Sequence, residues 1–135
     1  MNPTGIGLHL VDGGRRLKVL IADDERNIAD TIRIILNKDG MDAVAVYGGR
    51  AAIEKAGEWH PDVFLVDYVM PDLNGIEAAI EVGEKLPACR VLVISAMAAV
   101  PEVKQRLQGR EQRFEVLVKP IPPAELVQRI RAVSR

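Results

Sequence analysis

Short apolar runs alternate along this chain with segments of helical periodicity, and this alternation constrains the fold more than any other feature of the sequence. The runs, rich in Val, Ile and Leu, cover residues 18–22, 43–47, 63–66, 91–94 and 114–118. They do not alternate strictly between apolar and polar residues, as a strand with one solvent-exposed face would. They are therefore predicted to be parallel strands buried on both faces.

The segments between the runs carry helix signals. Ile28 and Ile32 share one face of a predicted helix, and another helix is expected after Gly75. Pro101 and Pro123 suit the first turns of two further helices. Strands that alternate with helices imply right-handed crossovers, with helices on both faces of the sheet. We therefore expect an α/β protein with a doubly wound, five-stranded parallel sheet.

Chain length and charge limit the classes of function that fit. The chain has 135 residues, which suits one domain, and 18 basic against 19 acidic side chains give a formal charge of -1. Electrostatic binding to nucleic acid or to an anionic membrane needs a basic excess, so neither partner is expected. The single cysteine, Cys89, cannot form an internal disulfide, and no apolar run approaches the roughly 20 residues of a membrane span. A cytoplasmic protein is predicted.

Residues 1–16 precede the first predicted strand and are expected to form a flexible N-terminal extension, since untethered termini are usually disordered. Asp12 and Gly13 in this extension would also fit a hairpin turn. That alternative is disfavoured, because both edges of the first strand are taken by neighbours in a doubly wound sheet of this kind. The folded domain is predicted to cover residues 17–135.

Polar side chains follow the ends of four predicted strands, and they are Asp23, Asp24, Asp67, Ser95 and Lys119. The carboxyl ends of parallel strands meet at one edge of a sheet, so these groups are expected to converge. Neighbouring carboxylates repel one another without a counter-charge, and hard oxygen ligands favour Mg²⁺ or Mn²⁺ over zinc. Asp67 is predicted to accept a phosphoryl group as a nucleophile, with Lys119 neutralising charge and Ser95 donating a hydrogen bond.

Four motifs of the sequence resemble the receiver domains of bacterial two-component response regulators. They are Asp23-Asp24, the stretch from Asp67 through Met70-Pro71 to Gly75, Ser95-Ala96, and Lys119-Pro120, in that order within residues 17–135. The resemblance implies a CheY-like, flavodoxin-like fold with strand order 2-1-3-4-5. It also implies a cis peptide bond before Pro120.

The same resemblance implies a function. Asp67 would take a phosphoryl group from a sensor histidine kinase or a phosphotransfer protein in a Mg²⁺-dependent reaction, with the backbone carbonyl of Val69 as a metal ligand beside Asp23, Asp24 and Asp67. The phosphorylated domain would signal to a downstream protein, or form a homodimer, through its last helices and fifth strand. Such a domain catalyses only its own phosphorylation and dephosphorylation, so it is not expected to be an enzyme in any other sense.

Three positions depart from the family pattern. Many receivers carry an aromatic residue three positions before the lysine, where this chain has Val116, and Phe114 would replace it only if the strand register differed. Val69 and Met97 occupy positions that tune the lifetime of the acyl phosphate in the family, and both are apolar here. Slow self-dephosphorylation is therefore predicted.

Three alternatives stand beside the phosphoacceptor interpretation. A phosphohydrolase with an aspartyl nucleophile would need a second acid where this chain has Val69. A flavin-binding or dinucleotide-binding module would need a glycine-rich loop where the chain has Asp23-Asp24-Glu25. A receiver-shaped interaction module that works without phosphorylation is hard to reconcile with the acidic and basic residues present, but the lack of an aromatic residue at Val116 leaves this alternative open.

Overall fold

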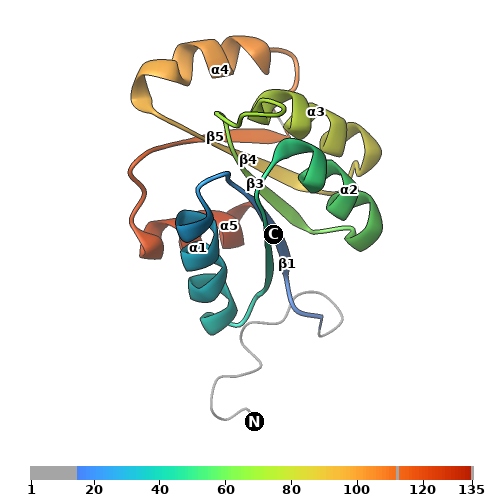
Figure 1. The fold of residues 1–135 in the computed structure, drawn as a ribbon, viewed down its shortest axis with the longest axis vertical. Helices are drawn as coiled ribbons and strands as arrows, with labels where there is room; N and C mark the ends of the chain where they lie inside the picture. Colours follow the sequence, from blue (N-terminus) through green and yellow to red (C-terminus); the bar gives the residue numbers. More distant parts are fainter. Residues whose placement is uncertain (1–14, 112, 135) are drawn as a thin grey trace.

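Five parallel strands form the centre of the structure, a computed structural model that describes residues 15–111 and 113–134. They are β1 (Lys18–Ala22), β2 (Asp42–Val46), β3 (Val63–Asp67), β4 (Arg90–Ser95) and β5 (Phe114–Val118). Neighbours pair in parallel in the order β2-β1-β3-β4-β5 (Figure 1). The strand order implied by the family resemblance is therefore confirmed.

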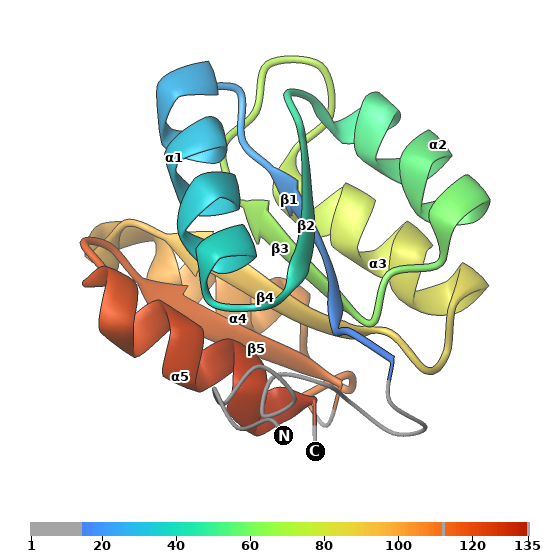
Figure 2. The same ribbon diagram turned by 90° about the horizontal axis from the view of Figure 1, so that it is seen from below.

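Helices cover both faces of this sheet. They are α1 (Arg26–Lys38), α2 (Gly49–Trp59), α3 (Gly75–Lys85), α4 (Val100–Arg106) and α5 (Pro123–Val133), with a 3-10 turn at Met97–Ala99 before α4. α1 and α5 lie on one face, and α2, α3 and α4 lie on the other (Figure 2). This is the doubly wound arrangement that the alternating pattern of the sequence predicted.

The sheet is apolar on both faces, so the protein has two layers of core. Every residue of β3 is buried, and the adjacent residues Phe64 and Leu65, which point to opposite faces, are 0% and 1% exposed. Phe64 belongs to a layer with residues of α2, α3 and α4, and Leu65 to a layer with residues of α1 and α5. Asp67, the last residue of the central strand β3, therefore lies at the carboxyl edge of the sheet and is held there by a strand that is buried on both faces.

Most element boundaries agree with the sequence prediction. β1 and β5 cover the predicted residues, whereas β3 and β4 extend one residue further at the carboxyl end, to Asp67 and Ser95. The hydrophobic pattern indicates α2 least clearly, because its buried positions are the small residues Gly49, Ala52 and Ala56. Such residues give little hydrophobic contrast in the sequence, although they allow a helix to approach its neighbours closely.

The predicted flexible extension over residues 1–16 lies mostly outside the described residues, which begin at Arg15. The Arg15 guanidinium donates two hydrogen bonds to the Asp62 carboxylate, at 2.7 and 2.8 Å. Arg16 donates from Nε to the carbonyl oxygen of Gly40 at 2.9 Å. These contacts tie the residues just before β1 to the connections that lead into β3 and β2.

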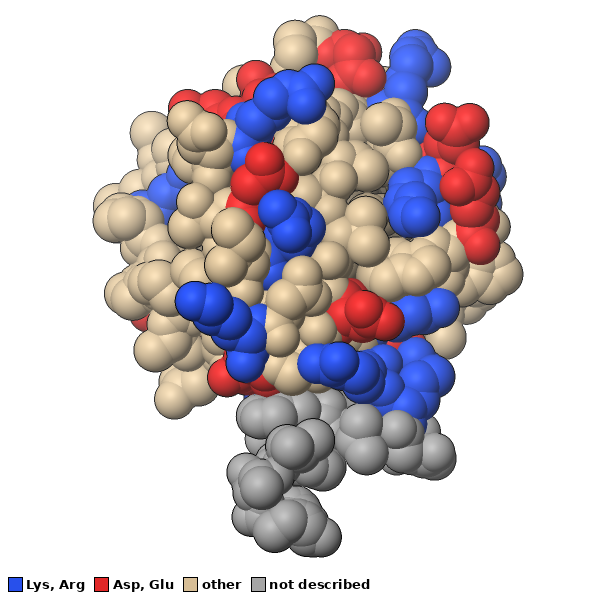
Figure 3. Space-filling view, turned by 60° about the horizontal axis from the view of Figure 1, so that its bottom comes forward, with Lys and Arg blue, Asp and Glu red and all other residues tan. Residues whose placement is uncertain are grey.

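Side chains of both charges are spread over the surface. Figure 3 shows Lys and Arg side chains mixed with Asp and Glu side chains on one face of the molecule. This distribution agrees with a formal charge of -1. Within residues 15–111 and 113–134, no helix has the length and apolar character needed to cross a membrane.

Candidate functional site

Three carboxylates meet at the carboxyl edge of the sheet. Asp23 and Asp24 directly follow β1, and Asp67 ends the neighbouring strand β3, which pairs with β1 in parallel register. One carboxylate oxygen from each residue lies within 4.8 Å of the others. Asp23 and Asp67 are buried, at 4% and 5% exposure, whereas Asp24 is exposed. The convergence of these side chains, predicted from their places at strand ends, is thus present in the structure.

Burial makes the charged form of two of these carboxylates unfavourable. Burial raises the pKa of Asp23, and the Asp67 charge adds to this, while a hydrogen bond from the Glu25 N–H at 3.0 Å opposes it. Burial likewise raises the pKa of Asp67, and Lys119 offsets only part of the rise. The cluster therefore has unsatisfied negative charge, which a bound divalent cation would neutralise.

Lys119 supplies one positive charge to the cluster. Its Nζ lies 3.0 Å from Asp67 Oδ1, and its backbone N–H donates to the Ser95 carbonyl at 2.9 Å, which holds the segment after β5 beside β4. Burial lowers the pKa of Lys119, but the hydrogen bond to Asp67 and the nearby carboxylates outweigh this, so the net pKa is raised and the amine stays protonated. The peptide bond between Lys119 and Pro120 is cis, as the resemblance implied.

Ser95 ends β4 next to the cluster and is 1% exposed. Its hydroxyl donates to the carbonyl oxygen of Ala96 at 2.7 Å. β3 and β4 pair with Asp67 opposite Ile94, so Ser95 lies one residue beyond the position of Asp67 along the sheet edge. To donate a hydrogen bond to a group on Asp67, the Ser95 hydroxyl has to rotate away from Ala96.

Two exposed apolar side chains lie on segments that follow the site strands. Val69, in the connection from β3 to α3, is 70% exposed, and Met97, in the turn after β4, is 74% exposed. Both positions are the apolar ones noted in the sequence. The Val69 side chain has no hydrogen-bonding group, and the Met97 thioether is only a weak acceptor, so neither offers a strong hydrogen bond that would orient a water molecule.

The register of β5 decides the question of the missing aromatic residue. Ser95 is opposite Val118, Val93 is opposite Val116, and Val91 is opposite Phe114. Phe114 therefore lies at the far end of β5, about 13 Å along the strand from Val118. Because β5 pairs with β4 without a shift that would bring Phe114 beside Ser95, Phe114 does not replace the aromatic side chain that many receivers have at the Val116 position.

Two contacts near the site were not anticipated from the sequence. The Tyr68 hydroxyl donates to Glu102 Oε2 at 2.7 Å and so joins the residue after Asp67 to α4. The Asp72 carboxylate accepts hydrogen bonds from the backbone of Gly49 and Arg50 at the start of α2. Each contact joins positions more than 20 residues apart, and no local sequence signal indicates such a pairing.

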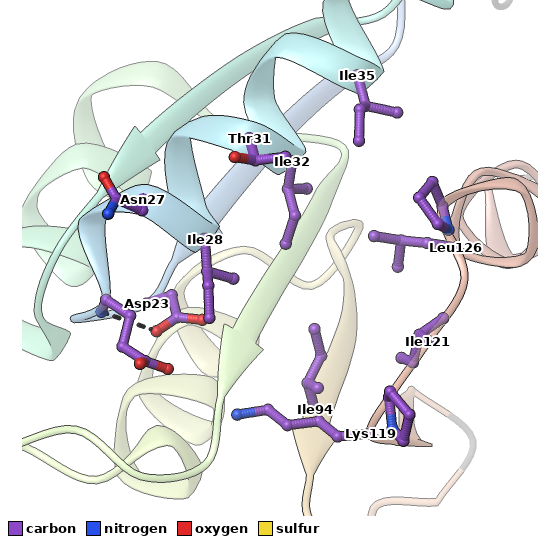
Figure 4. A pocket seen from close by; sticks show the side chains of 13 residues that line it. Asp23, Asn27, Ile28, Thr31, Ile32, Ile35, Ile94, Lys119, Ile121 and Leu126 are labelled. Carbon is purple, nitrogen blue, oxygen red and sulfur yellow. Dashed lines mark hydrogen bonds between the residues drawn. The ribbon is translucent and has the colours of Figure 1, made fainter.

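A cavity of ≈ 530 Å³ opens beside the cluster, between α1 and α5. Figure 4 shows Asp23 and Lys119 at one end of it and apolar side chains, including Ile28, Ile32 and Leu126, along its walls. The polar end belongs to the carboxylate site. The site therefore continues into an apolar groove.

The site and fold have close parallels among known proteins. The sequence profile of the family described as response regulator receiver domain matches residues 19–131. Over 119 residues the chain is 32% identical to the chemotaxis protein CheY of Thermotoga maritima. The matched region covers 87% of this chain and 98% of that protein. The chain therefore belongs to the response regulator receiver domain family, whose members act as signalling domains in two-component systems.

Solved structures agree with this assignment. Chemotaxis protein CheY4 of Vibrio cholerae superposes with a TM-score of 0.78 at 28% identity, over 87% of this chain and 98% of that chain. A CheY-like receiver domain protein of Methanospirillum hungatei superposes with a TM-score of 0.80 at 20% identity, over 87% and 93% of the two chains, which supports the fold. The CheY-like fold predicted from the sequence motifs is confirmed.

Proposed function

We propose that this chain is the phosphoacceptor of a two-component phosphorelay and that Asp67 receives the phosphoryl group from a phosphohistidine of a sensor kinase or phosphotransfer protein. One observation carries the proposal. The Asp67 carboxylate ends the buried central strand with a lysine amine 3.0 Å away and two further carboxylates within 4.8 Å. Family membership supports a phosphoacceptor role in general, and this geometry supports Asp67 as the residue.

The reaction needs little covalent chemistry from the protein. An oxygen of Asp67 attacks phosphorus, an O–P bond forms as the N–P bond to the donor histidine breaks, and the electron pair of that bond stays on the imidazole nitrogen. Lys119 then pairs with a phosphoryl oxygen, and Ser95 donates to another after leaving Ala96. Positioning and charge neutralisation supply most of the rate in such transfers.

The donor set fits Mg²⁺, with Mn²⁺ as the second choice. Asp23, Asp24 and Asp67 offer only hard oxygen atoms, and the backbone carbonyl of Val69 is proposed as a fourth ligand. When bound, the cation supplies positive charge to the transferring phosphoryl group. Asp23 and Asp24, which directly follow β1, would hold the cation together with Asp67.

The output of the domain is proposed to be a conformational change that a protein partner reads. The partner is a downstream target or a second copy, bound through the last helices and β5, in the cytoplasm and without direct contact to nucleic acid or membrane. The exposed apolar side chains of Val69 and Met97 would not orient a water molecule for attack on the acyl phosphate. We therefore predict that the phosphorylated domain loses its phosphoryl group slowly.

Intact-mass measurement after incubation with acetyl phosphate and Mg²⁺ tests the proposal. The wild-type chain should gain one phosphoryl group, Asp67→Asn should gain none, and EDTA should prevent the gain. Equal labelling of the two proteins would place the acceptor elsewhere. No labelling of either, with Mg²⁺ binding intact, would favour the interaction module that works without phosphorylation, the alternative that the lack of an aromatic residue at position 116 leaves open.

A further inference from the structure

The connection between β3 and α3, residues 68–74, borders the carboxylate cluster and is fixed at both of its ends. The Gly75 N–H donates to the Tyr68 carbonyl at 2.8 Å, which closes the connection on itself. Asn74 caps α3 by accepting the Glu77 N–H at 2.9 Å. Val69 lies inside this closed segment, two residues after Asp67.

The middle of the same connection is fastened to a different element. Asp72 Oδ1 accepts the Gly49 N–H at 3.0 Å, and Asp72 Oδ2 accepts the Arg50 N–H at 3.1 Å. These are the first two residues of α2, and the N-cap residue Gly48 provides no side-chain hydrogen bond of its own. Asp72 therefore caps α2 from a position 22 to 23 residues further along the chain.

The two backbones approach each other closely at this point. A β-carbon on Gly49 would lie 2.8 Å from both Cβ and the carbonyl oxygen of Leu73, closer than real side chains come. The N–H groups of Gly49 and Arg50 lower the pKa of Asp72, so the carboxylate is ionised at neutral pH. Gly49 thus allows the close approach of the two backbones, and the ionised Asp72 carboxylate accepts the hydrogen bonds formed there.

This contact connects the two sides of the carboxylate cluster. The Asp23 N–H donates to the Val46 carbonyl at the end of β2, 3.2 Å away, and α2 begins three residues after that strand ends. Asp72 attaches the start of α2 to the segment that holds Val69. The chain around the cluster is therefore linked from the Asp23 side, through β2 and α2, to the Val69 side.

We propose that Asp72 is a positioning residue of the phosphoacceptor site, which holds the Val69 segment in place for metal binding by fastening it to the first turn of α2. Asp72 itself touches neither the cluster nor the phosphoryl group. The inference rests on the proposed function, because it assigns Val69 to the metal site. Without the fastening, the segment between Met70, which is 6% exposed, and Asn74 loses the two hydrogen bonds that join it to the first turn of α2.

A simpler role for Asp72 is that of a helix cap, which would stabilise α2 without affecting the metal site. The two roles separate in a double variant that carries Gly48→Ser and Asp72→Ala. Gly48 has extended backbone angles, φ -164° and ψ 166°, which serine adopts readily, and serine is a preferred N-cap. A β-carbon on Gly48 would lie 3.2 Å from Asp72 Oδ2, and Asp72→Ala removes that crowding.

The experiment compares Mg²⁺ affinity and thermal stability in four unphosphorylated proteins that comprise residues 1–135. They are the wild type, Asp72→Ala, the double variant, and Asp42→Ala as a control at an exposed aspartate at the start of β2. Calorimetric titration with MgCl2 gives the affinity, and circular dichroism gives the melting temperature. We expect Asp72→Ala to bind Mg²⁺ about tenfold more weakly than the wild type and to have a lower melting temperature. The control should match the wild type in both quantities.

The double variant decides between the two roles. The proposal expects its melting temperature to recover while its Mg²⁺ affinity stays low. Recovery of both quantities, or unchanged affinity in Asp72→Ala, overturns the positioning role and leaves the proposed function intact. Failure of the wild type itself to bind Mg²⁺ overturns the proposed metal site, and the inference with it.

Discussion

The two walls of the acidic site are built differently. On the wall made by β1, β3 and the segments that follow them, two carboxylates are buried and hydrogen bonds cross between separate elements, as from Gly49 to Asp72. On the wall made by the end of β4 and by α4, the Ser95 hydroxyl bonds the carbonyl of the next residue. α4 has seven residues, no side-chain N-cap, and Val103 as its buried residue.

This contrast teaches that holding charge and transmitting a signal make opposite demands on the chain. Like charges stay together only where packing and hydrogen bonds prevent them from separating. An element that responds to phosphorylation must move at a low free-energy cost, which favours few buried contacts. We therefore expect substitutions on the first wall to affect stability and chemistry, and substitutions on the second to affect the mobility of α4.

The largest effect is expected at Gly75, where the first wall has no spare room. A β-carbon there would overlap the backbone oxygen of Asp67, so Gly75→Ala should lower the free energy of unfolding by about 3 kcal/mol. Gly57→Ala, in the last turn of α2, is the matched control, because the added carbon meets nothing within 4 Å beyond its own stretch of helix, and it should stabilise by up to about 1 kcal/mol. Urea denaturation measures both, and equal effects would contradict the tight approach.

Removal of the lysine amine should strongly reduce the chemistry of the first wall. In Lys119→Ala, Asp67 loses the cation 3.0 Å away, and the rate of phosphorylation by acetyl phosphate should fall about a hundredfold. Lys38→Ala is the control. Lys38 is the last residue of α1, at the end of that helix remote from the site, so this variant also loses one positive charge but should keep the wild-type rate. A rate for Lys119→Ala within twofold of the wild type would show that the amine does not act on the phosphoryl group.

The pH dependence of the free energy of unfolding should reveal the cost of ionising the buried carboxylate of Asp67. The pKa of Asp67 is raised in the folded state, so its contribution to stability is complete below the ordinary value of 3.8 and is lost as the pH rises through the raised value. Asp67→Asn removes the penalised charge. In EDTA it should be more stable than the wild type at pH 7, with an advantage that shrinks toward pH 4.

Urea midpoints measured between pH 4 and pH 7 test this dependence. Asp42→Asn, at an exposed carboxylate, serves as the control and should follow the wild type across the range. An Asp67→Asn protein that is less stable than the wild type at pH 7 would show that the ion pair with Lys119 outweighs the burial of Asp67.

The smallest effect is expected at the contact that joins the two walls. Tyr68→Phe removes the hydroxyl bonded to Glu102, and the amides of α4 should exchange with solvent about threefold faster. Phosphorylation by acetyl phosphate should not change, because the hydroxyl is directed at α4. Hydrogen exchange read by mass spectrometry makes the measurement, and unchanged protection of α4 would show that the contact does not restrain it.

The fold and the acidic cluster were predictable for related reasons. Runs such as residues 18–22 and 114–118 contain within themselves the apolar pattern of a buried strand, and the structure has strands at those positions. Asp23 and Asp67 follow or end adjacent strands, so the parallel topology brings them together whatever their neighbours are. α2 was less visible because small residues form its buried face.

The contacts of Asp72 and Tyr68 could not be predicted in the same way. Asp72 follows a proline in a turn, where an aspartate is common, and its partners lie 22 and 23 residues earlier. Whether a carboxylate in that turn meets the start of α2 depends on how closely α2 and α3 pack. Likewise, the register of β5, rather than the presence of Phe114 in the sequence, placed that ring far from Ser95.

The amino-acid sequence alone determined the order of strands and helices along the chain and the acidic and basic residues at the strand ends, because each of these depends on contiguous residues or on topology. The tertiary structure decided the burial of Asp23 and Asp67, the 3.0 Å contact of Lys119, and the fastening of Asp72 to α2. Those properties depend on distances between separate elements. Such distances follow from the packing of the whole core.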